Sequence, residues 1–453
     1  MLRLLILIFL AIGSLSFLGC TPIGPIRVTA DLPPDDAGKL PDQPRFDVEK
    51  SRECKNNNEH CVYIVEYDEF GNVFSRAQLN ASLLAAQKVA EEGGSVIVYV
   101  HGWHHSAKPG DENIEDFLDS VSEASQQADT KAVGIYIGWR GDSINSNNLA
   151  LKLPSYAFTF WGRKATAHAI GSGGGVSELF RKLSSIRANS DSRLVILGHS
   201  FGGAIVYSSV AQLLAEQISL DAAPGDDEEV YLLSEGFNPV ADLIVLLNPA
   251  FEAMRIAPLF TFARSHEYQE GLPPRLVVIT STADWATKVA FPVGRSLGTI
   301  FQGYPDAHSG KPNRRAIGHY VPYITHQLVV GACDNQPLMD RNKILSALNP
   351  EDTKAKNDNS ICFPADGSES SLILTRCDAQ DDCQKVTDGH FITRGLATEG
   401  YLPYRFPIAN IRTNASVIAG HNDIWEENIT RFLQGLLEEA LENPHDLPMA
   451  PPG

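Results

Sequence analysis

Short runs of almost wholly apolar residues recur along this chain, and amphipathic helical patterns separate them. Such runs are typical of strands that a parallel sheet buries on both faces. They lie in residues 95–103, 132–141, 193–200, 241–251 and 274–284. The helical patterns cover residues 76–93, 112–128, 149–187 (with a glycine-rich break at 171–175) and 202–218. This alternation predicts an α/β fold with a mostly parallel central sheet flanked by helices.

The rest of the chain divides around this predicted core. Residues 62–67 predict one arm of a β-hairpin that turns at Gly71 and Asn72. A strand at 404–414 and a long helix at 424–442 indicate that the core resumes late in the chain. We therefore expect five parts, namely a signal peptide (1–19), a Pro- and Asp-rich tether (20–60), the core (61–330), a polar cysteine-rich insertion with little strand pattern (331–400) and the end of the core (401–453).

The first 20 residues are typical of a processing signal. An apolar run from Leu4 to Gly19 follows Arg3, and it is shorter than the roughly 20 residues that a membrane span needs. Gly19 and Cys20 resemble the lipobox of bacterial lipoproteins. The resemblance implies cleavage before Cys20, lipid on its thiol and, because Thr21 is not Asp, attachment to the outer membrane facing the periplasm or the surface. An ordinary secretory signal is the alternative.

The cysteine count agrees with an oxidising compartment. Seven cysteines are present, and six remain if Cys20 carries lipid. Six can pair completely, and local pairing would join the neighbours along the chain, although the connectivity cannot be deduced. The six are Cys54, Cys61, Cys333, Cys362, Cys377 and Cys383. A zinc cluster is the alternative, but no CxxC pair supports it.

The formal net charge of −18 bears on the partners. Binding to a phosphate backbone needs clustered Lys and Arg, and no basic run is present. We therefore expect no nucleic-acid partner.

Residues 198–202, Gly-His-Ser-Phe-Gly, match the G-x-S-x-G pattern of a nucleophile elbow. The motif alone is weak, but a predicted buried strand precedes it and a predicted helix follows it, as an elbow requires. The helix N-terminus favours developing negative charge. We expect Ser200 to be a nucleophile, and a turn with a capping serine is the alternative.

The chain resembles the α/β-hydrolase superfamily, in its lipase and esterase branch, over residues 95–300 and 401–440. The resemblance implies an oxyanion hole made by the backbone N–H groups of Trp103, which follows His101-Gly102, and of Phe201. His104 and His105 are expected to be polar lining rather than metal ligands.

The family's Ser…Asp…His order implies Asp284 as the acid and His421 as the base. Asp284 follows a predicted strand, whereas its rival Asp242 precedes one and Asp306 lies far from any strand end. His421 precedes the final helix, which its rivals His319 and His326 do not. For His421 to reach Ser200, the strand at 404–414 must pair with the strand at 274–281.

The parts imply an ester hydrolase that works through an acyl-enzyme on Ser200, with no cofactor and no metal. Trp103, Phe251 and Trp285 are candidates to bind an apolar substrate, and the alternative is that some of them belong to the core. The substrate would be a small-molecule or lipid ester, and the membrane would be contacted through Cys20. Two alternative hypotheses remain. The protein could be a membrane-associated lipase or phospholipase, or a catalytically inactive binding lipoprotein on the same fold. Residues 155–175 could form a flap with glycine hinges.

Overall fold

The structure is a computed structural model of the whole chain. It describes residues 24–28, 47–56, 59–127, 130–141, 162–221, 239–264, 268, 273–304, 310–333, 336–349, 360–365, 370–377 and 406–442. The expected signal peptide, its cleavage site and Cys20 lie outside these residues.

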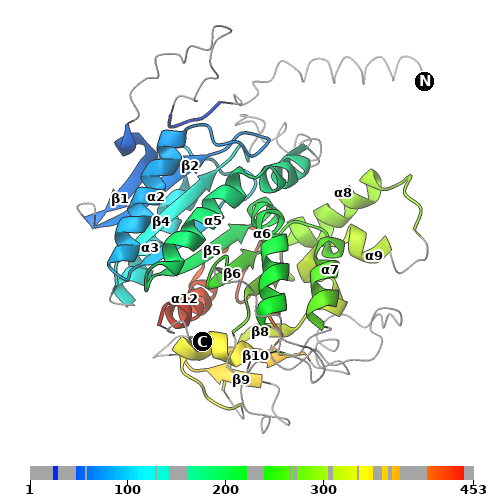
Figure 1. Cartoon of the computed structure of the whole chain (residues 1–453). Helices are drawn as coiled ribbons and strands as arrows, with labels where there is room; N and C mark the ends of the chain where they lie inside the picture. Colours follow the sequence, from blue (N-terminus) through cyan, green and yellow to red (C-terminus); the bar gives the residue numbers. More distant parts are fainter. Residues whose placement is uncertain are drawn as a thin grey trace, which may run out of the picture.

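One sheet of eleven strands runs through the described residues (Figure 1). Its spatial order is β1-β2-β4-β3-β5-β6-β7-β11-β8-β10-β9. The strands are β1 (Arg52–Lys55), β2 (His60–Glu66), β3 (Ser95–Val100), β4 (Ala132–Gly138), β5 (Arg193–His199), β6 (Leu243–Leu247), β7 (Leu276–Ser281), β8 (His326–Gly331), β9 (Ser360–Phe363), β10 (Ser371–Arg376) and β11 (Ile408–Thr413). From β2 to β8 every neighbouring pair is parallel, and β1, β10 and β9 pair antiparallel at the edges. The predicted α/β class with a mostly parallel sheet is confirmed.

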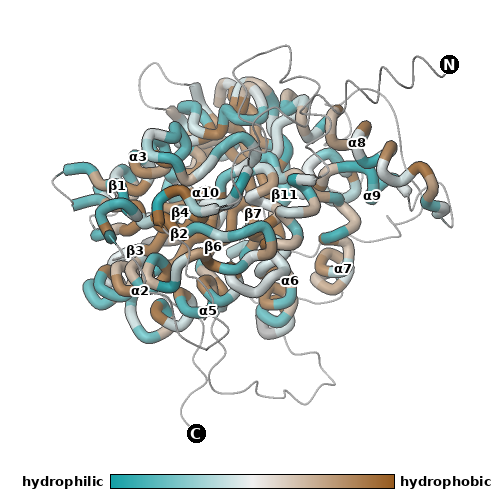
Figure 2. The backbone as a smooth tube through the Cα atoms, turned by 90° about the horizontal axis from the view of Figure 1, so that it is seen from above, coloured by the Kyte–Doolittle hydropathy of each residue, from teal (hydrophilic) through white to brown (hydrophobic). Residues whose placement is uncertain are grey.

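Helices cover both faces of the sheet. They are α2 (Arg76–Glu91), α3 (Glu112–Gln127), α5 (Gly175–Ala188), α6 (Phe201–Asp221), α7 (Ala253–Arg264), α8 (Phe291–Gly298), α9 (Gly310–Arg314), α10 (Ile344–Leu348) and α12 (Glu427–Glu442), with further helical residues at 162–172 and a π-helix, η3 (Ala286–Ala290). One apolar layer joins the sheet to α2, α5, α6 and α7, and a second joins its other face to α3, α10 and α12. Apolar residues follow the central strands in Figure 2, because helices bury these strands on both sides.

Chain order along the sheet reverses between β3 and β5. From β3 the chain moves to β4 on one side, and it later returns to β5 on the other side of β3. Loops that leave the carboxyl ends of two such strands diverge, and the crevice between them is where open α/β sheets bind ligands. The reversal lies between β3, whose following loop contains Gly102, and β5, which leads into the turn at Ser200.

The N-terminal region differs from the expectation in two ways. The expected hairpin after β2 is reduced to a single bridge between Tyr67 and Val73, because β2 pairs instead with β1. Part of the expected tether therefore belongs to the sheet. Arg27 is also buried, and its backbone N–H donates to the Glu66 carboxylate.

The insertion also contains more strand than expected. Within 331–400, β9 and β10 pair with each other, and β10 pairs with β8, so the insertion widens the sheet. The sequence Ser371–Arg376 alternates in burial, which is a strand pattern that its polar flanks obscured.

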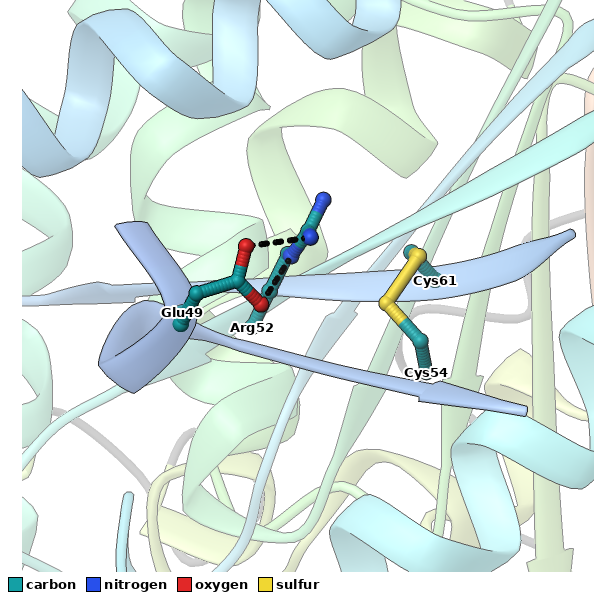
Figure 3. Close-up of a disulfide and its surroundings, with 4 residues drawn as sticks. All are labelled: Glu49, Arg52, Cys54 and Cys61. Atoms are coloured by element: carbon teal, nitrogen blue, oxygen red, sulfur yellow. Dashed lines mark hydrogen bonds and ion pairs between the residues drawn. A yellow bond between two sulfur atoms is a disulfide. The ribbon is translucent and has the colours of Figure 1, made fainter. Parts of the chain in front are cut away.

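Two disulfides close local loops. Cys54 on β1 is bonded to Cys61 on β2, directly across the strand pair (Figure 3). Cys333 is bonded to Cys362 on β9. Cys377 is disulfide-bonded as well, and Cys383, its expected partner, lies outside the described residues.

Candidate active site

Ser200 occupies a sharp turn between β5 and α6. Its φ of 55° lies in the left-handed region, which non-glycine residues rarely adopt. The turn is packed too tightly for side chains at its glycines, since a Cβ on Gly202 would lie 2.1 Å from the carbonyl oxygen of Val100. The N–H of Ser200 donates to the carbonyl of Leu247 at 3.0 Å, which fixes the turn against the end of β6.

Three side chains from separate loops meet at this turn. The Nε2 atom of His421 lies 2.7 Å from Oγ of Ser200, and its Nδ1 atom lies 2.8 Å from Oδ2 of Asp284. Because an ionised carboxylate only accepts, Nδ1–H donates to Asp284 and Nε2 accepts from the Ser200 hydroxyl. The expected contacts of Ser200, Asp284 and His421 are therefore present.

The sheet explains why these loops meet. β11 pairs parallel with β7 over its whole length, from Ile408 opposite Leu276 to Thr413 opposite Ser281. This confirms the expected strand pairing. Since the carboxyl ends of parallel strands share one edge, Asp284 and His421 emerge beside each other.

Asp284 is completely buried and held by more than the histidine. The N–H of Thr287 donates to its Oδ1 at 3.2 Å, and the Thr287 hydroxyl donates to its Oδ2. Burial raises the pKa of Asp284, but the charge and hydrogen bond of His421 and the two Thr287 bonds outweigh burial and leave the pKa below its ordinary value. The carboxylate is therefore ionised at neutral pH and can stabilise a protonated His421.

The rival residues have other roles in the described structure. His319 lies behind the acid, with Nε2 2.9 Å from the Thr287 hydroxyl, and burial lowers its pKa to about 3. His326 contacts the Thr325 hydroxyl through Nδ1. Asp242 accepts from the Arg187 guanidinium, at the opposite end of the sheet. Asp306 lies outside the described residues.

The loop that carries His421 is held by three side chains that the sequence analysis did not single out. Nε2 of His199 lies 2.8 Å from the His421 carbonyl oxygen, and Nδ2 of Asn248 lies 3.0 Å from the same atom. The Ser281 hydroxyl donates to the carbonyl of Ile418 at 2.7 Å. Burial holds the pKa of His199 well below its ordinary value, so its neutral ring donates through Nε2–H. All three follow or end buried strands at the same sheet edge, and that placement is the signal that could have identified them.

The loop after β3 approaches the elbow closely. A Cβ on Gly102 would lie 2.9 Å from the Cβ of Ser200 and 2.7 Å from Nδ1 of His199, so only glycine allows this approach. His101 is buried, and its Nδ1 lies 2.8 Å from the Gly102 carbonyl oxygen while its Nε2 accepts from the Trp139 N–H. Burial lowers the pKa of His101 to about 4, so a neutral ring holds the loop in shape.

Trp103 and Phe201, which the resemblance implies as the oxyanion donors, directly follow Gly102 and Ser200 along the chain. Phe201 is also the first residue of α6, where the positive end of the helix dipole lies. The rings of Trp103 and Phe201 lie 6.0 Å apart between centroids. His105 contacts the Asp111 carboxylate just before α3, with 3.0 Å between its Nδ1 and Oδ1 of Asp111.

The three candidate substrate-binding aromatics occupy different environments. Trp103 is partly buried and stacks on His104. Phe251 is fully buried, and its ring stacks on that of Tyr207 with 4.9 Å between the centroids. Phe251 therefore belongs to the core, as the alternative interpretation of the sequence proposed. Trp285 is 67% exposed and begins a row of apolar residues on the outside of the molecule.

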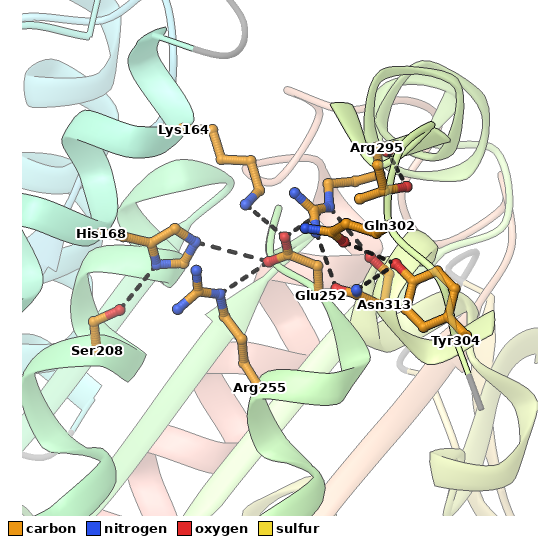
Figure 4. A network of polar contacts seen from close by, with 10 residues as sticks. Lys164, His168, Ser208, Glu252, Arg255, Arg295, Gln302, Tyr304 and Asn313 are labelled. Atoms are coloured by element: carbon orange, nitrogen blue, oxygen red, sulfur yellow. Dashed lines mark hydrogen bonds and ion pairs between the residues drawn. The ribbon is translucent and has the colours of Figure 1, made fainter. Parts of the chain in front are cut away.

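A buried carboxylate organises the helices beside the elbow (Figure 4). Glu252, in the loop after β6, is 3% exposed and contacts Lys164 Nζ at 2.7 Å, Arg295 Nε at 2.8 Å and Arg255 Nε at 2.9 Å. Burial raises the pKa of Glu252, but the cations, led by Lys164, outweigh it and lower the pKa to about 2. His168 adds a bond to the Ser208 hydroxyl on α6. The described part of the expected flap is residues 162–175, and within it Lys164 is held to Glu252 before α7 and His168 to Ser208 on α6.

Within the described residues, no group of three or more His, Cys, Asp and Glu side chains is arranged to hold a metal ion. Comparison of the chain with protein-family models, with curated proteins and with solved structures finds no match.

Proposed function

We propose that this protein is a serine hydrolase of carboxylic esters on an α/β-hydrolase fold. The observation that carries the proposal is the hydrogen-bonded series from Ser200 through His421 to Asp284, with distances of 2.7 and 2.8 Å. The strained turn between a buried strand and a helix supports it, as does the chain order Ser…Asp…His.

In the proposed mechanism, Nε2 of His421 takes the proton of Ser200 as Oγ attacks the ester carbonyl carbon. Asp284 keeps the proton on Nδ1 and stabilises the imidazolium that forms. The tetrahedral oxyanion accepts from the N–H groups of Trp103 and Phe201. His421 then protonates the leaving alcohol, and water activated by the same ring releases the acid from the acyl-enzyme.

The experiment is covalent labelling with a fluorophosphonate, together with hydrolysis of p-nitrophenyl butyrate. Wild-type protein should be labelled once and should turn over the ester. Ser200→Ala should lose labelling and lower kcat by roughly 10⁵-fold or more while the circular dichroism spectrum stays unchanged. Ser185→Ala, at an exposed serine on α5, is the matched control and should retain both. An unlabelled, folded wild-type protein would support the inactive binding lipoprotein instead.

We also propose that the mature chain is anchored in a bacterial envelope through lipid on Cys20. The lipobox-like residues support this, and the disulfides agree with an oxidising compartment. No helix among the described residues is long and apolar enough to cross a membrane. Cys20→Ser should abolish incorporation of labelled palmitate, and palmitate that persists in this variant would refute the anchor.

A further inference from the structure

A row of apolar side chains lies on the outside of η3 and α8. Of the eleven large apolar side chains that are exposed among the described residues, six lie between positions 285 and 301. Four of them recur at every fourth position, which places them along one side of the helix. The six, which we name the α8 surface, are Trp285, Val289, Val293, Leu297, Ile300 and Phe301, with exposed fractions from 39% at Val289 to 100% at Phe301.

The opposite side of this helical segment is firmly attached to the protein. Thr287, Phe291 and Gly294 are buried, and Arg295 contacts Glu252. A surface helix of a globular protein normally turns its apolar side inward. Here both sides are apolar in part, and the outer one meets solvent at the margin of the molecule (Figures 1 and 2). Large contiguous apolar patches on protein surfaces often mark sites of protein or membrane interaction.

The described residues of the segment that forms α8 and α9 carry charges of one sign, and Asp306 in the connection between the two helices lies outside the described residues. Residues 285–304 and 310–319 contain five Lys and Arg residues and no Asp or Glu, in a chain of net charge −18. The five are Lys288, Arg295, Lys311, Arg314 and Arg315, and all except Arg295 are exposed. Lys311 and Arg314 lie on α9, which packs against α8, so the helix next to the apolar row carries these cations.

We propose that the α8 surface docks in the interface of a bilayer that contains anionic lipid. Such a bilayer offers an acyl layer for the apolar row and negative headgroups for the nearby cations. A second copy of the chain would fit less well, because a symmetric contact would bring the same cations together. Since Trp285 directly follows Asp284, docking would bring the Ser200 edge of the sheet toward the lipid. The proposal depends neither on ester hydrolysis nor on Cys20.

The test measures quenching of Trp285 fluorescence by brominated lipid in full-length protein. Vesicles contain phosphatidylglycerol and dibrominated phosphatidylcholine, and Trp285→Phe gives the background of the other tryptophans. Leu84→Trp in the Trp285→Phe protein is the matched control, because Leu84 on α2 has the same exposed fraction of 67%. We expect strong quenching of Trp285 and little quenching at position 84. A readout at the α8 surface itself is needed because the apolar N-terminus can also bind vesicles.

Substitutions should separate the apolar contribution to docking from the electrostatic one. Val293→Ser with Leu297→Ser should weaken docking by roughly tenfold per residue. Lys311→Glu should weaken it by roughly fivefold or more on anionic vesicles, whereas Lys88→Glu on α2 should not. Equal quenching at positions 84 and 285, or Trp285 quenching that is unchanged on purely neutral vesicles, would overturn the proposal. The proposal would also be overturned if Trp285 stayed unquenched, the protein were a dimer, and Val293→Ser with Leu297→Ser converted this dimer to a monomer.

Discussion

Glu252 offers a quantitative test of how the helices beside Ser200 are held. Glu252→Gln keeps the shape of the side chain but leaves the buried Lys164 ammonium and the Arg295 guanidinium without their anion. The pKa of Glu252 falls from 4.5 to about 2 in the folded chain. At 1.36 kcal/mol per unit, this shift corresponds to roughly 3 kcal/mol of stability. Removing one partner of a buried ion pair typically costs 3–5 kcal/mol, which agrees.

The pH dependence gives the sign of the effect. Because the folded pKa is depressed, the stabilisation is fully present above pH 4.5 and is lost as the pH falls toward 2. The difference in unfolding free energy between wild type and Glu252→Gln should therefore be roughly 3 kcal/mol at pH 7 and roughly half of that at pH 3. Urea denaturation followed by tryptophan fluorescence at both pH values measures it.

An exposed ion pair provides the control for this prediction. Glu427 on α12 lies 4.0 Å from Arg431, and its side chain is 71% exposed. Glu427→Gln should change the unfolding free energy by less than about 1 kcal/mol. Glu252→Gln combined with Lys164→Met should cost less than Glu252→Gln alone, because the most buried of the three cations is then no longer left without its anion. A Glu252→Gln effect below about 1 kcal/mol, or one independent of pH, would refute the reasoning.

Three further predictions concern the elbow and its supports. Gly202→Ala should lower esterase activity by roughly 100-fold, because its Cβ would lie 2.1 Å from a β3 carbonyl oxygen, whereas Gly303→Ala, in open space, should not. His199→Phe should lower kcat by roughly tenfold with little change in KM, because the His421 carbonyl loses a donor; an unchanged kcat would exclude a positioning role. Burial lowers the pKa of His101 to about 4 in the folded chain, so on acidification the His101 ring is protonated in the unfolded chain before it is protonated in the folded one. The urea midpoint of unfolding should therefore fall as the pH drops below 6.5. This fall should be smaller in His101→Gln.

Much of the sheet and the contacts around Ser200 could be predicted because they depend on local pattern. Buried parallel strands are continuous apolar runs, and their carboxyl ends share an edge, so Asp284 and His421 could be assigned to one edge before their distance was known. The strand at Ile408–Thr413 follows the same rule, although it lies far along the chain from β7.

Other features depend on partners that a local pattern does not reveal. β1 pairs antiparallel with β2 and is joined to it by the Cys54–Cys61 disulfide, and its residues Arg52–Lys55 have no alternating apolar pattern that indicates a strand. Glu252 looks like any loop glutamate in sequence, and its importance comes from cations on three separate helices. Phe251 and Trp285 each lie a few residues after a strand, yet Phe251 packs on Tyr207 of α6 and is buried, whereas Trp285 is exposed.

Asp284 and His421 are 137 residues apart in sequence, because the chain between them forms α8, α9 and the edge strands β8, β9 and β10 before it returns as β11. The chain after β7 passes through α8 and α9 and then enters the sheet as β8, on the far side of the place that β11 later fills. β10 and β9 extend the sheet outward from β8, so they widen it without entering the space between β7 and β11. Loop closure over a longer segment adds little cost, because the cost grows only with the logarithm of its length. The β7–β11 register, with the bonds from His199 and Asn248, therefore fixes His421 beside Ser200 whatever the length of the segment between them.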